Sequence, residues 1–152
     1  MASAIHILCV GKGGRDPAAA LAERYLKRLP VGVRLVEVSD RGPADGDGRR
    51  RREAEKLRAR MPEGSLVIAL DESGEVRDSR AFAAALAGWQ ETGRPLSFLI
   101  GGADGLDPAL RAAADVRLSL SAMTWPHMLV RAMLAEQLYR AFSILRGHPY
   151  HR

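Results

Sequence analysis

Cysteine is almost absent from this chain. Cys9 is the single cysteine among 152 residues, which excludes an internal disulfide and any zinc site built from cysteines. It lies inside the apolar run from Ile5 to Val10, where a buried and unreactive thiol is the expected role. Histidine is scarce as well, with four scattered residues, so we predict no bound metal.

Long apolar stretches are also missing. No run approaches the roughly 20 residues that a membrane-spanning helix needs, and the start, MASAIHILCVGKGG, is too short and wrongly flanked for a signal peptide. We therefore expect a cytoplasmic protein with no membrane partner. With 47% hydrophobic and 27% charged residues, the chain is expected to form a single domain over residues 1–152 around its own core.

Several familiar catalytic motifs do not occur. The chain has no Gly-x-Ser-x-Gly elbow, no Walker loop and no His-Glu-x-x-His zinc motif. The segment Gly101 to Gly105 lacks the spacing of the dinucleotide fingerprint, which disfavours a nucleotide-binding oxidoreductase. No nucleophile with its base can be named. A reaction that needs positioning and at most one proton removal therefore fits better than covalent catalysis.

Acidic residues are in the minority. The formal net charge is +5, and residues 49–60 hold seven Arg or Lys against two Glu. Such an excess favours a polyanionic partner such as nucleic acid. The alternative is a solvated surface helix supported by the pairs Arg49 with Glu53 and Arg51 with Glu55, one turn apart. Both interpretations of this segment stay open.

Strand and helix signals alternate along the chain. Apolar or alternating runs predict strands at 5–10, 33–38, 66–70, 96–100 and 116–120. Caps or helical spacing predict helices after Asp16-Pro17 and Asp107-Pro108 and over 49–60, 79–91 and 126–145, with a loop at 41–48. This alternation predicts an α/β fold with a doubly wound, mostly parallel sheet.

Ligands of such sheets bind at the carboxyl ends of the strands. Three of these ends are unusual here, at residues 70–74, 100–105 and 120–127. The glycines at 101, 102 and 105 indicate either a tight turn or close approach of the backbone to a ligand. Asp71 and Asp104 could accept hydrogen bonds from a ribose or an amino group, or lie in water as loop carboxylates.

The last helix has two apolar faces, about 160° apart at 100° per residue. One contains Leu134 and Leu138, and the other contains Ala135 and Phe142. One face can cover the sheet. The second is buried either within the subunit or by a second copy, and we expect a homodimer. The tail after it, HPYHR, could stack on a base, contact phosphate or move a proton.

Four strings in this order, LDESGE, FLIGGADGLDP, LSLSAMTWPHMLVRAMLAEQLYRAFSI and HPYHR, closely resemble the RlmH family. Its members are SPOUT-class methyltransferases that use S-adenosylmethionine to methylate N3 of a pseudouridine in 23S ribosomal RNA. The resemblance runs over nearly the whole chain and is strongest from Leu96 to Arg152. It implies an α/β-knot fold with a C-terminal trefoil knot, a homodimer packed through the C-terminal helix, and the ribosome as partner.

The resemblance also implies a set of site residues. The cofactor would contact Leu70, Gly101, Gly102, Leu120, Ser121, Ala122, Met123, Thr124 and Trp125. For catalysis we hypothesise roles for His127, His148, Tyr150, His151 and Arg152. Arg131 and Arg152 would hold RNA phosphate or stabilise the developing negative charge. A histidine could remove the proton from the target nitrogen, or the tail could only position RNA. The main rival function is a non-enzymatic RNA-binding or ribosome-binding protein.

Overall fold

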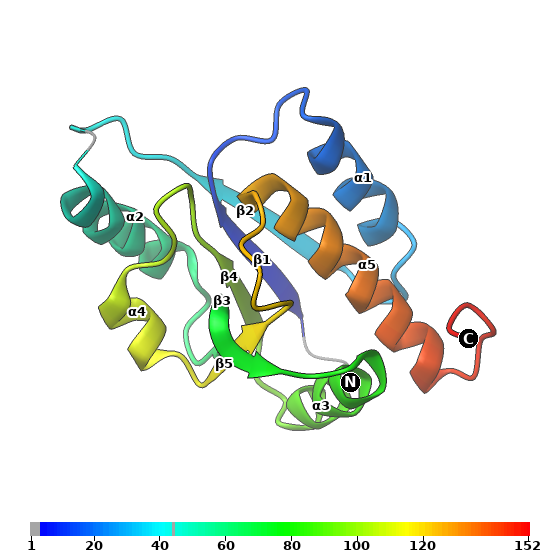
Figure 1. Ribbon diagram of the computed structural model, residues 1–152. Coiled ribbons are helices and arrows are strands. Elements are labelled where there is room, and N and C mark those ends of the chain that lie inside the picture. The colour runs from blue at the N-terminus through cyan, green and yellow to red at the C-terminus, as the bar shows by residue number, and fades with distance from the viewer. Residues whose placement is uncertain (1–3, 44) are drawn as a thin grey trace.

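A single parallel sheet forms the centre of the molecule (Figure 1). The computed structural model describes residues 4–43 and 45–152, so the first three residues of the predicted N-terminal segment and one residue of the predicted 41–48 loop lie outside it. Neighbouring strands follow the order β2-β1-β4-β3-β5, and every pair is parallel. The strands are β1 (Ile5–Val10), β2 (Val33–Val38), β3 (Leu66–Val76), β4 (Leu96–Ile100) and β5 (Val116–Ser119).

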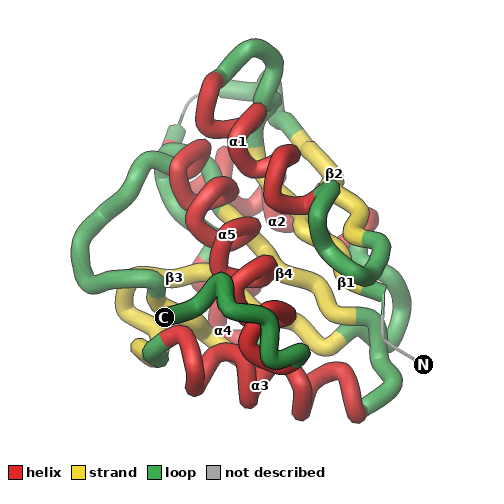
Figure 2. Tube along the Cα trace, turned by 90° about the vertical axis from the view of Figure 1, so that its right-hand side faces the viewer, coloured by secondary structure: helices red, strands yellow, loops and turns green. Residues whose placement is uncertain are grey.

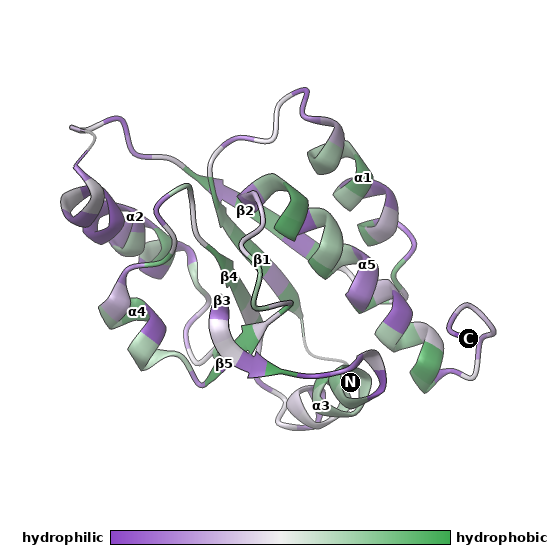
Figure 3. Ribbon diagram, in the orientation of Figure 1, coloured by the Kyte–Doolittle hydropathy of each residue, from purple (hydrophilic) through white to green (hydrophobic). Residues whose placement is uncertain are grey.

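Helices cover both faces of this sheet, as predicted for a doubly wound fold (Figures 1 and 2). One face packs against α1 (Pro17–Leu26), α3 (Ser79–Glu91) and α5 (His127–Leu145). The other packs against α2 (Gly46–Arg60) and α4 (Pro108–Ala113). Apolar residues gather in the strands and on the inward sides of the helices, whereas α2 is mainly hydrophilic (Figure 3). No helix in the described ranges is long and apolar enough to cross a membrane.

The two Asp-Pro signals mark helix starts. The Asp16 carboxylate accepts a hydrogen bond of 2.8 Å from the N–H of Ala18 at the start of α1. The Asp107 carboxylate does the same for α4, where it accepts hydrogen bonds of 3.1 and 3.3 Å from the N–H groups of Ala109 and Leu110. These caps satisfy donors that have no partner inside the helix. Both predicted helices are thereby confirmed.

Two predicted boundaries were wrong. Strand β3 does not end at residue 70 but continues to Val76, with a register shift between Leu70 and Glu75, both of which pair with Leu118. The intervening residues bulge, and Gly74 allows this because a Cβ there would lie 2.8 Å from the backbone of Arg117. The predicted 41–48 loop also ends early, because Asp45 caps α2 and the helix begins at Gly46.

The basic helix α2 lies on the surface, but its ion pairs differ from those predicted. Neither Arg49 with Glu53 nor Arg51 with Glu55 forms an ion pair in the described part of the chain. Glu53 instead turns inward and is 6% exposed. The cations of α2 that do pair have other partners: Arg50 pairs with Asp47, and Arg52 and Lys56 both pair with Asp40.

Most of both apolar faces of α5 is buried within the chain itself, although Leu145 at its end is 44% exposed. Leu134 and Leu138 pack against the sheet and are fully buried. The opposite face, at Ala132 and Ala135, packs against Ala22 on α1. The second face therefore needs no second copy to cover it, so these residues do not support the homodimer, which stays a prediction. Small residues on both helices allow α1 and α5 to approach closely.

Candidate functional site

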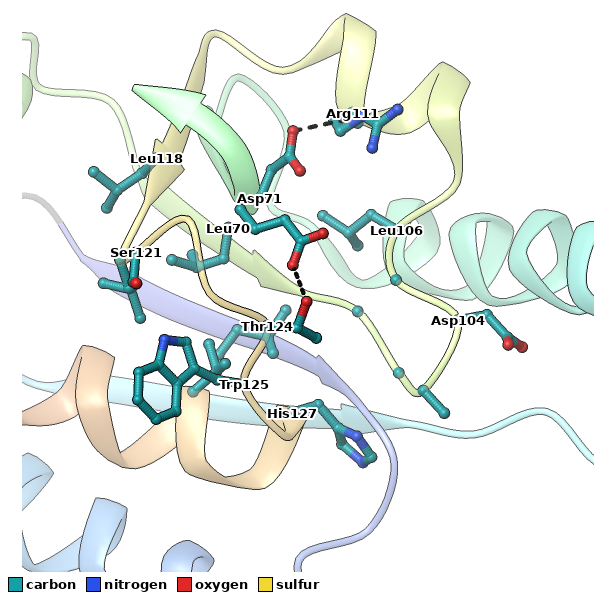
Figure 4. A pocket seen from close by; sticks show the side chains of 18 of the residues that line it. Leu70, Asp71, Asp104, Leu106, Arg111, Leu118, Ser121, Thr124, Trp125 and His127 are labelled. Atoms are coloured by element: carbon teal, nitrogen blue, oxygen red, sulfur yellow. Dashed lines mark hydrogen bonds and ion pairs between the residues drawn. The ribbon is translucent and has the colours of Figure 1, made fainter. Parts of the chain in front are cut away.

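Three loops at the carboxyl edge of the sheet enclose a pocket of about 320 Å³ (Figure 4). The first is the bulge within β3, and the other two follow β4 and β5; all three fall in the segments that the sequence singled out as strand ends. Ala122 does not line the pocket, and His127 at the start of α5 does. The other residues predicted to contact a cofactor all line it: Leu70, Gly101, Gly102, Leu120, Ser121, Met123, Thr124 and Trp125.

The bulge of β3 holds the loop that follows β5. The Oγ1 of Thr124 donates to Oε2 of Glu72 at 2.6 Å, and the Oγ of Ser119 donates to the backbone carbonyl of Glu72 at 3.0 Å. Asp71 beside it forms an ion pair with Arg111 of α4, with 3.7 Å between Oδ2 and Nε (Figure 4). Glu72 and Arg111 were not predicted as pocket residues, because Glu72 lies in a bulge that no local pattern predicts and Arg111 reaches the pocket beside its partner Asp71.

The glycine turn after β4 is explained by the protein's own packing. A Cβ on Gly101 would lie 2.6 Å from the backbone of Gly105, and one on Gly102 would lie 2.9 Å from Cγ1 of Val10. Gly105 has a φ of 78°, a conformation that favours glycine, and its N–H donates to the carbonyl of Gly102 at 3.0 Å. The turn therefore borders the pocket with bare backbone.

Of the predicted catalytic residues, the pocket contains His127 alone within the described chain. The C-terminal tail lies at the other end of α5, whose 19 residues span about 27 Å. His148, Tyr150, His151 and Arg152 are therefore not brought to the pocket of their own chain.

The tail packs on the last turns of α5. The Oη of Tyr150 donates to Oε1 of Glu136 at 3.2 Å, and its ring meets Tyr139 with 4.7 Å between centroids. Nδ1 of His151 lies 3.0 Å from a guanidinium nitrogen of Arg140. Burial, a hydrogen bond with Tyr25 and the charge of Glu136 raise the pKa of Tyr150 to about 12. The phenol therefore stays protonated at neutral pH and acts as a hydrogen-bond donor.

The prediction that Arg131 contacts RNA was wrong. Its side chain is 1% exposed, and its guanidinium donates to the Glu37 carboxylate at 2.5 Å and to the carbonyl of Gly11 at 2.8 Å. A buried guanidinium with two partners cannot reach a phosphate. Burial alone would raise the pKa of Glu37, but hydrogen bonds from Arg131 and from the N–H of Gly13 outweigh it and hold that pKa below its usual value.

Cys9 is buried as predicted, with 0% exposure. Burial raises the pKa of its thiol to about 12, so the sulfur stays protonated. Among the described residues, no group of three or more His, Cys, Asp or Glu side chains could hold a metal ion.

A parallel α/β sheet with a pocket between its carboxyl-end loops defines a cofactor-binding class of fold. Comparison with known protein families identifies which class this is. A family model described as "Predicted SPOUT methyltransferase" matches residues 3–151. The chain belongs to the SPOUT methyltransferase family.

Relatives within that family narrow the comparison further. A protein of Roseobacter denitrificans named Ribosomal RNA large subunit methyltransferase H is 53% identical over 157 residues, which cover 97% of this chain and 98% of the relative. A protein of Paramagnetospirillum magneticum with the same name is 51% identical over 147 residues, which cover 96% and 97%. The likeness therefore extends over almost the full length of each protein.

Solved structures share the fold at low sequence identity. A probable methylase family protein from Haemophilus influenzae Rd KW20 has a TM-score of 0.61 at 14% identity, and the match covers 100% of this chain and 72% of that one. The SpoU methyltransferase AviRb from Streptomyces viridochromogenes, in complex with the cofactor AdoMet, has a TM-score of 0.50 at 16% identity, with coverage of 92% and 58%.

Proposed function

We propose that this chain is a ribosomal RNA large-subunit methyltransferase that uses S-adenosylmethionine to methylate N3 of a pseudouridine in 23S ribosomal RNA. The observation that carries the proposal is the single pocket into which eight of the nine predicted cofactor residues converge. Relatives named Ribosomal RNA large subunit methyltransferase H, about half identical over nearly the whole length, support it. The substrate is the ribosome, in the cytoplasm.

The pocket suits S-adenosylmethionine chemically. Leu118 and Ile100 give it an apolar floor, and carboxylates of Asp71, Glu72 and Asp104 line it. A sulfonium cation and an amino group favour such carboxylates, whereas an adenine can lie against the apolar floor and the bare backbone of the glycine turn. A neighbour in fold binds AdoMet, which agrees with this choice of cofactor.

The bound cofactor supplies an electrophilic methyl group. The target imide nitrogen carries a proton, so a base must accept it or the site must stabilise the resulting anion. We assign this step to His127, and its position in the pocket lining at the first turn of α5 supports the assignment. In the tail, Tyr150 stacks on or hydrogen-bonds the target base, and Arg152 stabilises the negative charge that develops on it.

This division of roles requires a second copy, since the tail cannot reach the pocket of its own chain. We propose a homodimer that packs through α5. A groove of about 570 Å³ along α5 supports it, lined by the apolar side chains of Leu21, Tyr25, Phe82, Leu129 and Met133. Leu21 and Leu129 are 40% and 41% exposed, and an apolar surface of this kind favours a protein partner. The family further implies a trefoil knot in the C-terminal half.

Two measurements test the function. Calorimetry with S-adenosylmethionine and with NADH should show saturable binding of the first alone. Mass spectrometry of 23S ribosomal RNA from a strain that lacks the gene should show the loss of one methyl group, restored by the wild-type gene. Absence of S-adenosylmethionine binding would instead favour a non-enzymatic RNA-binding protein.

A further inference from the structure

The edge of the sheet that carries the pocket also carries exposed cations without partners. Lys12 and Arg15 lie in the loop after β1, Arg41 lies in the loop after β2, and Arg51 lies in the first half of α2. All four are exposed, and within the described residues none forms an ion pair or a side-chain hydrogen bond. We call these four residues the cationic rim.

The cationic rim lies on two sides of the pocket. On one side, a Cβ on Gly11 would lie 3.4 Å from Nε2 of the pocket residue His127, and Lys12 follows directly. On the other side, Arg50 lines the pocket and its guanidinium lies 3.4 Å from the carbonyl of Asp104, and Arg51 follows directly. In Figure 1 the loop after β4 lies between these two segments, and the start of α5 lies beside the loop after β1.

Five carboxylates at the same edge have partners other than the rim cations. Three carboxylates pair with cations outside the rim, and two more cap helices. The pairs are Glu37 with Arg131, Asp40 with Arg52 and Asp47 with Arg50, and the caps are Asp16 on α1 and Asp45 on α2. None of these five carboxylates pairs with a rim cation, so all four rim side chains remain available to the phosphates of a polyanion.

We infer that the cationic rim binds the phosphates of one RNA strand on both sides of the target nucleotide. The inference rests on the proposed function and adds the surface by which RNA is held. Phosphate contacts carry no base specificity, but they fix the register and orientation of a strand. A strand anchored on either side of the pocket presents the base between the two anchors to the pocket. This small protein then needs no contacts that read the base sequence.

The test removes three charges from the rim and compares the effect per charge with the removal of one charge elsewhere. The rim variant carries Lys12→Gln, Arg15→Gln and Arg51→Gln. The control is Arg34→Gln, because Arg34 is also exposed but lies near the start of β2, at the opposite edge of the sheet. Binding of a poly(U) oligonucleotide is measured over a salt series for both variants, with circular dichroism as the check on folding.

For the rim variant we expect the slope of log affinity against log salt to become shallower by about 2, since each lost phosphate contact removes roughly 0.7 from it. With bacterial ribosomes as substrate, KM should rise by about an order of magnitude while kcat and the dissociation constant of S-adenosylmethionine stay unchanged. Arg34→Gln should match the wild type in all these measurements.

An unchanged salt slope in the rim variant would overturn the inference. So would an equal loss per charge in Arg34→Gln, because that would mean a general effect of net charge and not a localised surface. Failure of the proposed function would look different: the wild type would bind no S-adenosylmethionine and would not methylate ribosomes, while the rim variant would still bind poly(U) with a shallower salt slope.

Discussion

At the scale of single residues, the pair between Arg131 and Glu37 is the most consequential interaction outside the pocket. It ties α5 to β2 and, through the carbonyl of Gly11, to the loop after β1. It therefore fixes the start of α5, where His127 faces the pocket. We expect Glu37→Gln to lower the free energy of unfolding by about 2 to 3 kcal/mol, because a buried guanidinium loses its charged partner.

Urea denaturation measures this loss. The matched control is Glu75→Gln, which removes a 3.0 Å pair with Arg77 on the surface, where the Glu75 side chain is 61% exposed. Exposed pairs contribute up to about 1 kcal/mol, so this control should change little. Equal losses in the two variants would contradict the role of Arg131. Acid should also weaken the wild-type protein: the pKa of Glu37 is lowered on folding, so the unfolded state takes up its proton first as pH falls.

The Cys9 thiol gives a second prediction at this scale. Its pKa is raised to about 12 by burial, against an ordinary value near 8.5. At about pH 8, near that ordinary pKa, we expect iodoacetamide to leave the native protein unmodified. In guanidinium, where the chain is unfolded, it should label Cys9 fully, and mass spectrometry measures both results. Because the unfolded chain releases this proton first, the free energy of unfolding should fall as pH rises between the two pKa values. Rapid labelling of the native protein would contradict the burial.

At the scale of elements, the cap of α4 couples stability to the pocket. Asp107 accepts hydrogen bonds from the first turn of α4 and is 9% exposed, and it follows the glycine turn directly. Asp107→Ala should lower the free energy of unfolding by about 1 kcal/mol and weaken S-adenosylmethionine binding, because the turn and Arg111 shift with the helix. Thermal unfolding and calorimetry measure the two effects, and Asp107→Asn, which keeps a cap, should leave both near wild type.

The same scale shows what the sequence could and could not predict. Local signals sufficed for the strands and for both Asp-Pro helix starts, because periodicity and capping act within a few residues. The bulge of β3 was missed, since it depends on Gly74 fitting against the backbone of Arg117 in another strand. The role of Arg131 was missed for a related reason: its partner Glu37 is 94 residues away. One signal existed, because Glu37 falls on an otherwise apolar face of its strand.

The site residues likewise divide into those that local sequence signals predict and those that depend on tertiary contacts. Eight of the nine residues predicted to contact a cofactor line one pocket, because they belong to short segments at strand ends that the fold brings together. Glu72 and Arg111 could not be predicted, as each enters the pocket through a tertiary contact. The place of the tail could not be predicted either, since a sequence does not show how far the end of a helix lies from its start once both are packed.

At the scale of the whole molecule, this separation is the central feature. One end of α5 borders the pocket and the other holds Tyr150 and Arg152, about 27 Å away. If the tail serves catalysis, each active site needs the pocket of one copy and the tail of another. Each copy in a symmetric pair then contributes to both sites.

Mixing two inactive variants tests this arrangement. One variant lacks residues 148–152, and the other carries Thr124→Trp, which fills the pocket and should abolish S-adenosylmethionine binding in calorimetry. Each alone should methylate no ribosomes. After unfolding together and refolding at equal amounts, half of the dimers are mixed and each holds one intact site, so about a quarter of wild-type activity should return. If the tail acted within its own chain, a mixed dimer would contain no complete site, and the mixture would stay as inactive as its components.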